Sequence, residues 1–183
     1  MEGEGLETSR RTPSPRHPGA RNAAWVRVVG GADRGWLDAA VRAWLIATLP
    51  SLALFLLRVR LGWITPAPAS GMPGVRVVLY ASVGAPVLET ALMMVVAWPL
   101  ARVLRHSLPR IVALAALAAL AHLPGGGASQ ALIALWPFLV YATVLFAWYE
   151  RSGAAAFAMT ALVHALYNAT FLATGFAMVA TLE

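Results

Sequence analysis

The sequence contains no cysteine and no lysine, and charged residues make up only 12% of its 183 positions. Without cysteine, the chain cannot form a disulfide, use a thiolate nucleophile or build a cysteine-based metal site. A soluble domain usually carries about twice this fraction of charge. Apolar residues instead account for 60% of the chain. The composition therefore indicates a membrane protein.

All 14 basic residues are arginines, and seven of them lie at or before Arg42. A net charge of +6 is compatible with nucleic-acid binding. Here, however, the arginines lie in an N-terminal tail and in short stretches between apolar runs. Lipid headgroups are therefore the expected partners of these arginines, and no nucleic-acid partner is expected.

Residues 1–35 are rich in arginine, proline, serine and glycine. The stretch 12–19 reads TPSPRHPG and cannot bury enough apolar surface to offset the entropy lost on ordering. We expect residues 1–35 to form a disordered tail and residues 36–183 to form a transmembrane helical domain.

Five apolar segments follow the tail. They are Leu37–Val59, Val77–Ala101, Ile111–Leu123, Ala128–Tyr149 and Ala154–Ala180. The third covers only about 20 Å of a bilayer core about 30 Å thick, so it either begins earlier, near Ser107, or is a short buried helix. The expected fold is all-α, a polytopic transmembrane bundle of about five segments, with prolines inside the helices tolerated as kinks.

The arginines also predict an orientation. If the N-terminus is cytoplasmic, 11 arginines lie inside and three outside, which the positive-inside rule favours. The inner set is the seven up to Arg42 with Arg102, Arg105, Arg110 and Arg151, and the outer set is Arg58, Arg60 and Arg76. Trp36, Trp63 and Trp148 are typical of residues at the membrane interface.

Glu89, His122, His164 and Asn168 are nearly all of the strongly polar residues in the last four segments. Polar groups inside a membrane are costly and often mark a functional site. A carboxyl group in such an interior can act as a general base or acid. His164 and Asn168 are four residues apart, so both project from one helix face and could donate hydrogen bonds to an oxyanion.

Each of these residues also has a structural interpretation. Glu89 can pair with an arginine or a backbone group, and His122 can lie at the membrane interface beside the loop that follows it. His164 and Asn168 can form interhelical hydrogen bonds. Their origin in three separate helices favours a site, because bundle cores assemble their sites in this way.

Three short motifs carry these residues. They are Ala85–Thr90 with Glu89, Ala118–Leu123 with His122, and His164–Asn168, preceded by the stretch Phe146–Gly153. In this order they resemble the motifs of the CPBP family of intramembrane proteases (the CAAX-protease and bacteriocin-processing, or Abi, family). The family pattern is Glu-Glu-x-x-x-Arg, then Phe-x-x-x-His, then His-x-x-x-Asn/Asp. The resemblance covers about residues 83–175.

The resemblance implies an intramembrane endopeptidase of a bacterial plasma membrane that hydrolyses peptides or membrane proteins. Glu89 and His122 would activate a water molecule, and His164 and Asn168 would stabilise the oxyanion. Many family members are described as metalloproteases, which makes Glu89, His122 and His164 candidate ligands of a divalent metal such as zinc. The sequence itself requires no cofactor. It lacks the His-Glu-x-x-His zinc motif and the Gly-x-Ser-Gly motif of a serine nucleophile.

Three positions depart from the family pattern. Thr90 replaces the second glutamate, Met94 replaces the arginine, and Ala118 replaces the phenylalanine. Thr90 could still orient Glu89 by a hydrogen bond, whereas the lost arginine removes a charge partner. The alternative is therefore a weakly active or inactive CPBP-like membrane protein, acting in bacteriocin self-immunity or as a membrane partner.

Overall fold

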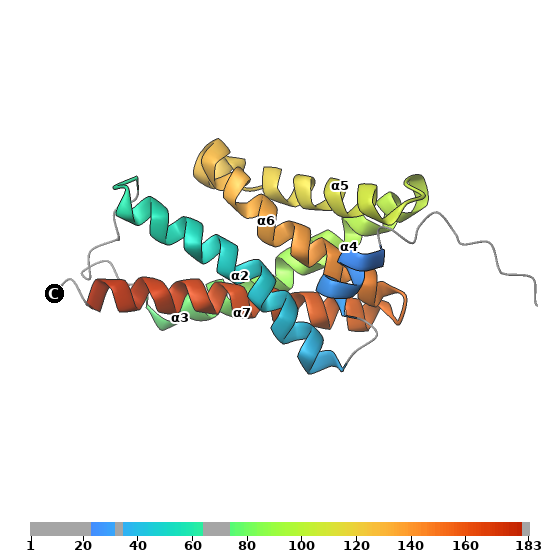
Figure 1. Cartoon of the computed structure of the whole chain (residues 1–183), viewed down its shortest axis with the longest axis horizontal. Helices are drawn as coiled ribbons and strands as arrows, with labels where there is room; N and C mark the ends of the chain where they lie inside the picture. The colour runs from blue at the N-terminus through green and yellow to red at the C-terminus, as the bar shows by residue number, and fades with distance from the viewer. Residues whose placement is uncertain (1–22, 32–34, 64–73, 181–183) are drawn as a thin grey trace, which may run out of the picture.

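The computed structural model describes residues 23–31, 35–63 and 74–180, and all regular elements in these ranges are helices (Figure 1). In chain order they are α1 Ala23–Trp25, π-helix η2 Val26–Gly30, α2 Trp36–Arg60, α3 Val75–Leu79, π-helix η4 Tyr80–Gly84, α4 Ala85–Val103, α5 Ser107–Leu120, α6 Leu123–Tyr149 and α7 Gly153–Ala180. The predicted all-α bundle is confirmed.

Four helical stretches among the described residues are long and apolar enough to cross a membrane. They are Trp36–Arg60, Val75–Val103, Gly127–Tyr149 and Gly153–Met178. Helix α5 has 14 residues and covers about 21 Å. It begins at Ser107, as one of the two sequence interpretations proposed, and remains shorter than a bilayer core. Gly127 breaks the start of α6 with a φ of 67°, a backbone conformation that glycine adopts without strain.

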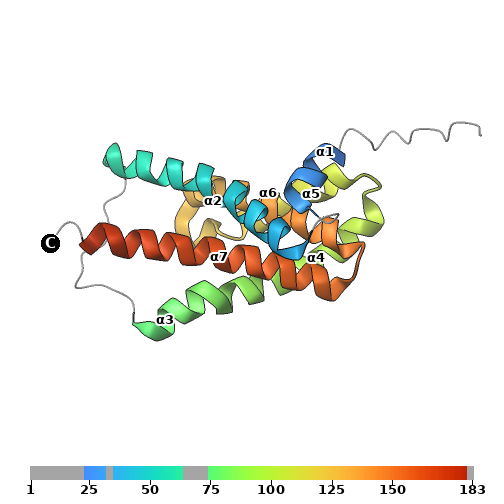
Figure 2. The ribbon, with the colours of Figure 1, turned by 60° about the horizontal axis from the view of Figure 1, so that its bottom comes forward.

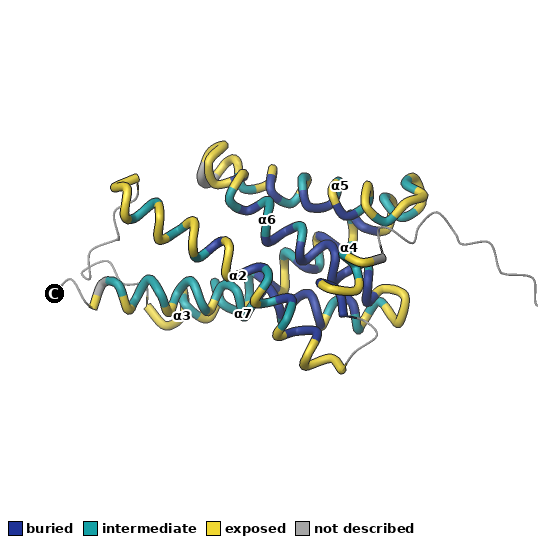
Figure 3. The backbone as a smooth tube through the Cα atoms, in the orientation of Figure 1, coloured by how far each residue is buried: buried dark blue, intermediate teal, exposed yellow. Residues whose placement is uncertain are grey.

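Helix α6 is the central element of the bundle. Its residues 140–145 are all buried, and Figure 3 shows the buried backbone concentrated where α6 meets its neighbours. Of the apolar stretches, that of α6 is 67% buried, against 17–33% in the other three. Helices α5 and α7 make the most extensive contacts with α6. Any site in the core would therefore be lined in part by residues of α6.

Small residues let the helices approach closely. On α2, Ala39, Ala43 and Ala47 are spaced four apart and are at most 1% exposed. On α5, Ala115 and Ala119 repeat the same spacing and are also buried. This spacing produces a ridge of small side chains along one helix face, which permits close packing in the absence of bulky residues.

The outer surface of the bundle is apolar. Large side chains such as Leu49, Leu88, Val95 and Trp98 are more than half exposed. A soluble monomer rarely carries such a continuous apolar surface. Lipid tails would cover it without cost, and the helical backbone satisfies its own hydrogen bonds, as a membrane interior requires.

The segment Ala23–Gly30 differs from the disordered tail that the sequence predicted. It is helical and packs against α6, with Val29 fully buried. The indole nitrogen of Trp25 donates to Thr143 Oγ1 at 2.9 Å. The prediction of disorder through residue 35 is therefore wrong for this segment, because its own apolar residues find partners on α6. The proline-rich stretch 12–19 lies outside the described residues.

Trp148 is a second correction. It was predicted to lie at the membrane interface, yet it is only 4% exposed, whereas Trp36 and Trp63 are more than 60% exposed. The indole nitrogen of Trp148 donates to the carbonyl oxygen of Gly30 at 2.7 Å. The N-terminal helical segment thus covers Trp148 and satisfies its polar atom.

The connections divide between the two ends of the bundle. The end of α2, the α5–α6 connection and the end of α7 lie at one end, and the α4–α5 and α6–α7 connections lie at the other (Figures 1 and 2). At the second end, Arg110 donates from its guanidinium to the carbonyls of Ala101 and Leu104. These are carbonyls that the end of α4 leaves without helical partners.

Candidate functional site

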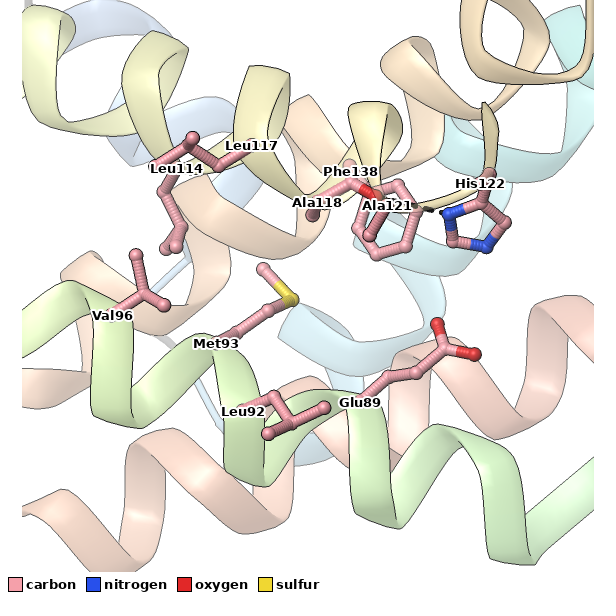
Figure 4. Close-up of a pocket in the computed structure, with 10 residues that line it drawn as sticks. All are labelled: Glu89, Leu92, Met93, Val96, Leu114, Leu117, Ala118, Ala121, His122 and Phe138. Carbon is pink, nitrogen blue, oxygen red and sulfur yellow. Dashed lines mark hydrogen bonds between the residues drawn. The ribbon is translucent and has the colours of Figure 1, made fainter. Parts of the chain in front are cut away.

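Glu89 lies in the first turns of α4, and its side chain is 31% exposed. Ala85 begins this helix directly after η4, and Pro86 follows it, so the missing N–H of proline falls at the junction of the two elements. Figure 4 shows the carboxyl group pointing from α4 toward His122, across the space between α4 and α5. The structure thus directs the polar end of Glu89 into the bundle and not toward the lipid-facing surface.

His122 forms the corner between α5 and α6. Its Nδ1 lies 3.0 Å from the carbonyl oxygen of Ala118. A carbonyl oxygen can only accept a hydrogen bond, so Nδ1 carries the proton of this bond. In the neutral imidazole, Nε2 is then left with a free lone pair. His122 is therefore held in the tautomer that can accept a proton.

His164 approaches Glu89 from α7. Its Nε2 lies 3.7 Å from Glu89 Oε2, and the residue is only 4% exposed. This separation is too long for a hydrogen bond but short enough for an ionic attraction if the imidazole is protonated. His122 lines the same pocket as Glu89, and the ring of Phe138 contacts both His122 and His164. Three predicted site residues therefore meet, and each comes from a different part of the bundle.

Asn168 takes a different partner. Its amide nitrogen donates to the carbonyl oxygen of Ala81, at 2.9 Å. Ala81 lies in η4, where the N–H of Ala85 bonds to the carbonyl of Tyr80, five residues earlier. In this register the carbonyl of Ala81 would pair with residue 86, which is proline and has no N–H. Asn168 therefore satisfies a carbonyl that Pro86 leaves free.

The two predicted pairs are consequently rearranged. We expected Glu89 with His122 as a base pair and His164 with Asn168 as oxyanion donors. In the structure His164 faces Glu89, and the Asn168 amide bonds to the preceding turn of the helix that carries Glu89. Asn168 also does not line the pocket described below. Side chains four residues apart share a helix face, but each meets a different neighbouring element.

Two aromatic residues that the sequence analysis did not single out contact the imidazoles. Tyr141 stacks on His164 with ring centroids 4.4 Å apart. Phe138 contacts both rings, at 5.1 Å from His122 and 5.9 Å from His164. The sequence feature that could have indicated this is the spacing of three residues between Phe138 and Tyr141, which places both rings on one helix face.

A pocket of about 150 Å³ opens beside this group of residues. It lies between α4 and α5, with Phe138 of α6 as part of its wall (Figure 4). Glu89 and His122 are the ionisable residues in its lining, and the other lining residues are apolar. His164 lies behind the carboxyl group and does not line the pocket. A bound molecule would thus meet Glu89 and His122 directly.

The positions that depart from the family pattern do not support Glu89. Thr90 is fully buried, and its hydroxyl has no hydrogen-bond partner within the described ranges. The predicted bond from Thr90 to Glu89 is therefore not formed. Met94 approaches Gly153 at the start of α7 and supplies no charge. Ala118 lines the pocket, where it leaves space open.

The residues present do not fit a metal centre. Across the part of the chain that the structure describes, no three histidine, aspartate or glutamate side chains are arranged to hold a metal ion. Glu89, His122 and His164 are close, but His164 is shielded by Tyr141 and Phe138.

Fold and site together define a polytopic helical membrane protein with a carboxyl group and two imidazoles beside an apolar pocket. The chain matches no family model, no curated protein and no solved structure. The resemblance to CPBP proteases remains a prediction from the residues.

Proposed function

We propose that the protein is an intramembrane peptide hydrolase of the CPBP type. The observation that carries the proposal is the meeting of Glu89, His122 and His164 beside one pocket. Burying such groups together in an apolar bundle costs free energy, and groups of this kind commonly mark a site of chemistry. The order of the three sequence motifs, which contain these same residues, supports the same class.

In the proposed reaction, Glu89 or the free Nε2 of His122 takes one proton from a water molecule. The water oxygen then attacks the peptide carbonyl carbon, and the carbon–nitrogen bond breaks as the departing amine receives that proton. His164 would position the carboxyl group of Glu89 through their 3.7 Å contact. This role differs from the oxyanion role that the family resemblance implies.

We further propose that the protein resides in a bacterial plasma membrane with its N-terminus in the cytoplasm, and that its substrates are peptides or membrane proteins. Arg58 and Arg60 lie in the last turn of α2 and Arg76 in α3, while Arg102 lies in the last turn of α4 and Arg151 follows α6. Together with the N-terminal arginines, this unequal distribution of arginine favours a cytoplasmic location for the end of the bundle that holds the α4–α5 and α6–α7 connections.

The test of the hydrolase proposal is cleavage by the purified protein in lipid nanodiscs, with a pool of membrane peptides and mass-spectrometric detection. Glu89→Gln and His122→Ala should each lower kcat/KM by about 100-fold or more, as expected when a general base is removed. Glu150→Gln and His106→Ala are the matched controls, because both residues are exposed and outside the pocket. Unchanged cleavage by both pocket variants would overturn the proposal.

A second candidate is a non-catalytic membrane protein on the same scaffold, acting in immunity or as a partner. It is favoured by the unpartnered Thr90 hydroxyl and by Glu89 Oε2, which has no hydrogen bond among the described residues. An active carboxyl group is usually held by such bonds. Cleavage that depends on Glu89 would exclude this candidate, and a wild-type protein that cleaves no peptide would favour it.

A further inference from the structure

The pocket beside Glu89 and His122 changes character along its length. Its ionisable groups lie at one end, and beyond them Met93, Val96 and Leu114 form apolar walls (Figure 4). From Glu89 to Val96, α4 advances by about 10 Å. An occupant that presents a polar bond to Glu89 and His122 would therefore place an apolar group in the remaining space.

The volume limits this group. A protein cavity of about 150 Å³ lined by leucine, isoleucine and phenylalanine binds benzene, and the pocket here has a volume of about 150 Å³. A leucine or phenylalanine side chain matches this size. A prenyl chain is several times longer than a benzene ring, so most of it would remain outside the pocket.

Alanines on α5 create the space. Ala118 and Ala121 both line the pocket, and Ala118 lies one helical turn before His122. A larger side chain at position 118 would fill the region next to the ionisable end. Ala116 belongs to the same helix but does not line the pocket, so it provides a matched comparison.

The pocket is partly open at the outer surface of the bundle. Leu92 and Leu117 belong to its lining, and they are 57% and 50% exposed. Both therefore face outward, where a membrane would supply lipid. A peptide segment within the bilayer could reach the pocket sideways, between α4 and α5.

We propose that this pocket binds a single apolar side chain, of leucine or phenylalanine size, from a membrane-embedded peptide substrate. The inference rests on the proposed hydrolase function for the chemistry at Glu89 and His122. It names the substrate class as an unmodified apolar peptide segment and makes Ala118 the residue that sets the accepted size.

The test is photo-crosslinking in nanodiscs with a synthetic leucine- and alanine-rich membrane-spanning peptide that carries one photoleucine. Wild-type protein and the Glu89→Gln variant should both give adducts on Leu92, Met93 or Leu117. Ala118→Leu should lower the adduct yield by about tenfold, because a close-packed interior has no room for both groups. Ala116→Leu should leave the yield unchanged.

Competition then tests the size limit. Unlabelled peptides with leucine or phenylalanine at the probe position should compete, and peptides with glycine or farnesyl-cysteine there should not. Three results would each overturn the inference. The first is equal competition by farnesyl-cysteine, and the second is an adduct yield of Ala118→Leu equal to that of the wild type. The third is formation of the same adducts by a photoreactive lipid in the absence of peptide. Because Glu89→Gln is expected to bind, pocket binding without cleavage would count against the hydrolase alone. Cleavage that depends on Glu89, with unaltered crosslinking in Ala118→Leu, would count against the pocket alone.

Discussion

At the scale of single residues, Tyr141 is the main support of His164. Its ring stacks on the imidazole, and its hydroxyl is buried without a hydrogen-bond partner within the described ranges. A buried polar group without a partner costs free energy. The ring of Tyr141 and its hydroxyl therefore act on stability in opposite directions.

This opposition gives a prediction for two substitutions of Tyr141. Tyr141→Phe keeps the stacked ring and removes the unpartnered hydroxyl, so the Tm should be unchanged or higher. Tyr141→Ala should lower the free energy of unfolding by about 3–5 kcal/mol, the usual cost of removing a large buried aromatic side chain. Thermal unfolding of the detergent-solubilised protein measures both. If Tyr141→Phe were as damaging as Tyr141→Ala, the hydroxyl would have to be making a stabilising bond.

At the scale of elements, the junction of η4 and α4 immediately precedes Glu89 and helps to set its position relative to the pocket. Pro86 removes one backbone donor, and Asn168 of α7 replaces it at the carbonyl of Ala81. Bulges of the π type are often found near functional sites in helices. The junction therefore ties α7 to the helix that carries Glu89.

A double-mutant cycle tests this compensation. Asn168→Leu should cost about 1–2 kcal/mol, because a partly buried carbonyl loses its donor. In a Pro86→Ala background the new N–H can bond to Ala81, so the same change at position 168 should cost less. We expect a coupling of about 0.5–2 kcal/mol between the two positions, measured by thermal or denaturant unfolding. Strictly additive costs would show that Pro86 and Asn168 do not share this carbonyl.

The docking of η2 on α6 gives another prediction at the element scale. A Cβ at Gly30 would clash with the side chain of Ala147, whereas a Cβ at Gly35 would meet nothing. Gly30→Ala should therefore destabilise the protein by about 1–3 kcal/mol through overpacking, and Gly35→Ala should not. The readout is protection of the Ala23–Gly30 segment from proteolysis together with the Tm. Equal effects of the two substitutions would contradict the close contact of Gly30 with Ala147.

At the scale of the whole molecule, the lack of cysteine permits a clean test of orientation. Leu61 and Glu150 are both exposed and lie at opposite ends of the bundle, after α2 and after α6. With a cytoplasmic N-terminus, an impermeant maleimide should label Leu61→Cys in intact bacterial cells. Glu150→Cys should react only after the cells are permeabilised. The reverse pattern would mean that the arginine-rich end faces outward.

The sequence could predict those elements that depend on local properties, but not those that depend on contacts with distant residues. Long apolar runs predicted the spanning helices, because run length and polarity are local properties. The segment Ala23–Gly30 was missed because its order depends on contacts with Thr143 and Trp148, more than a hundred residues away along the chain. The short α5 stayed ambiguous because its length does not decide whether it crosses the bilayer.

The sequence by itself determined the membrane class of this protein and showed which strongly polar residues its apolar segments carry, since both depend on which side chains occur in apolar runs. Only the tertiary structure decided which of these residues meet. Glu89 faces His164 and shares a pocket with His122, whereas Asn168 bonds to Ala81. The physical reason is that such contacts depend on how helices rotate and cross, and this follows from packing across the whole bundle.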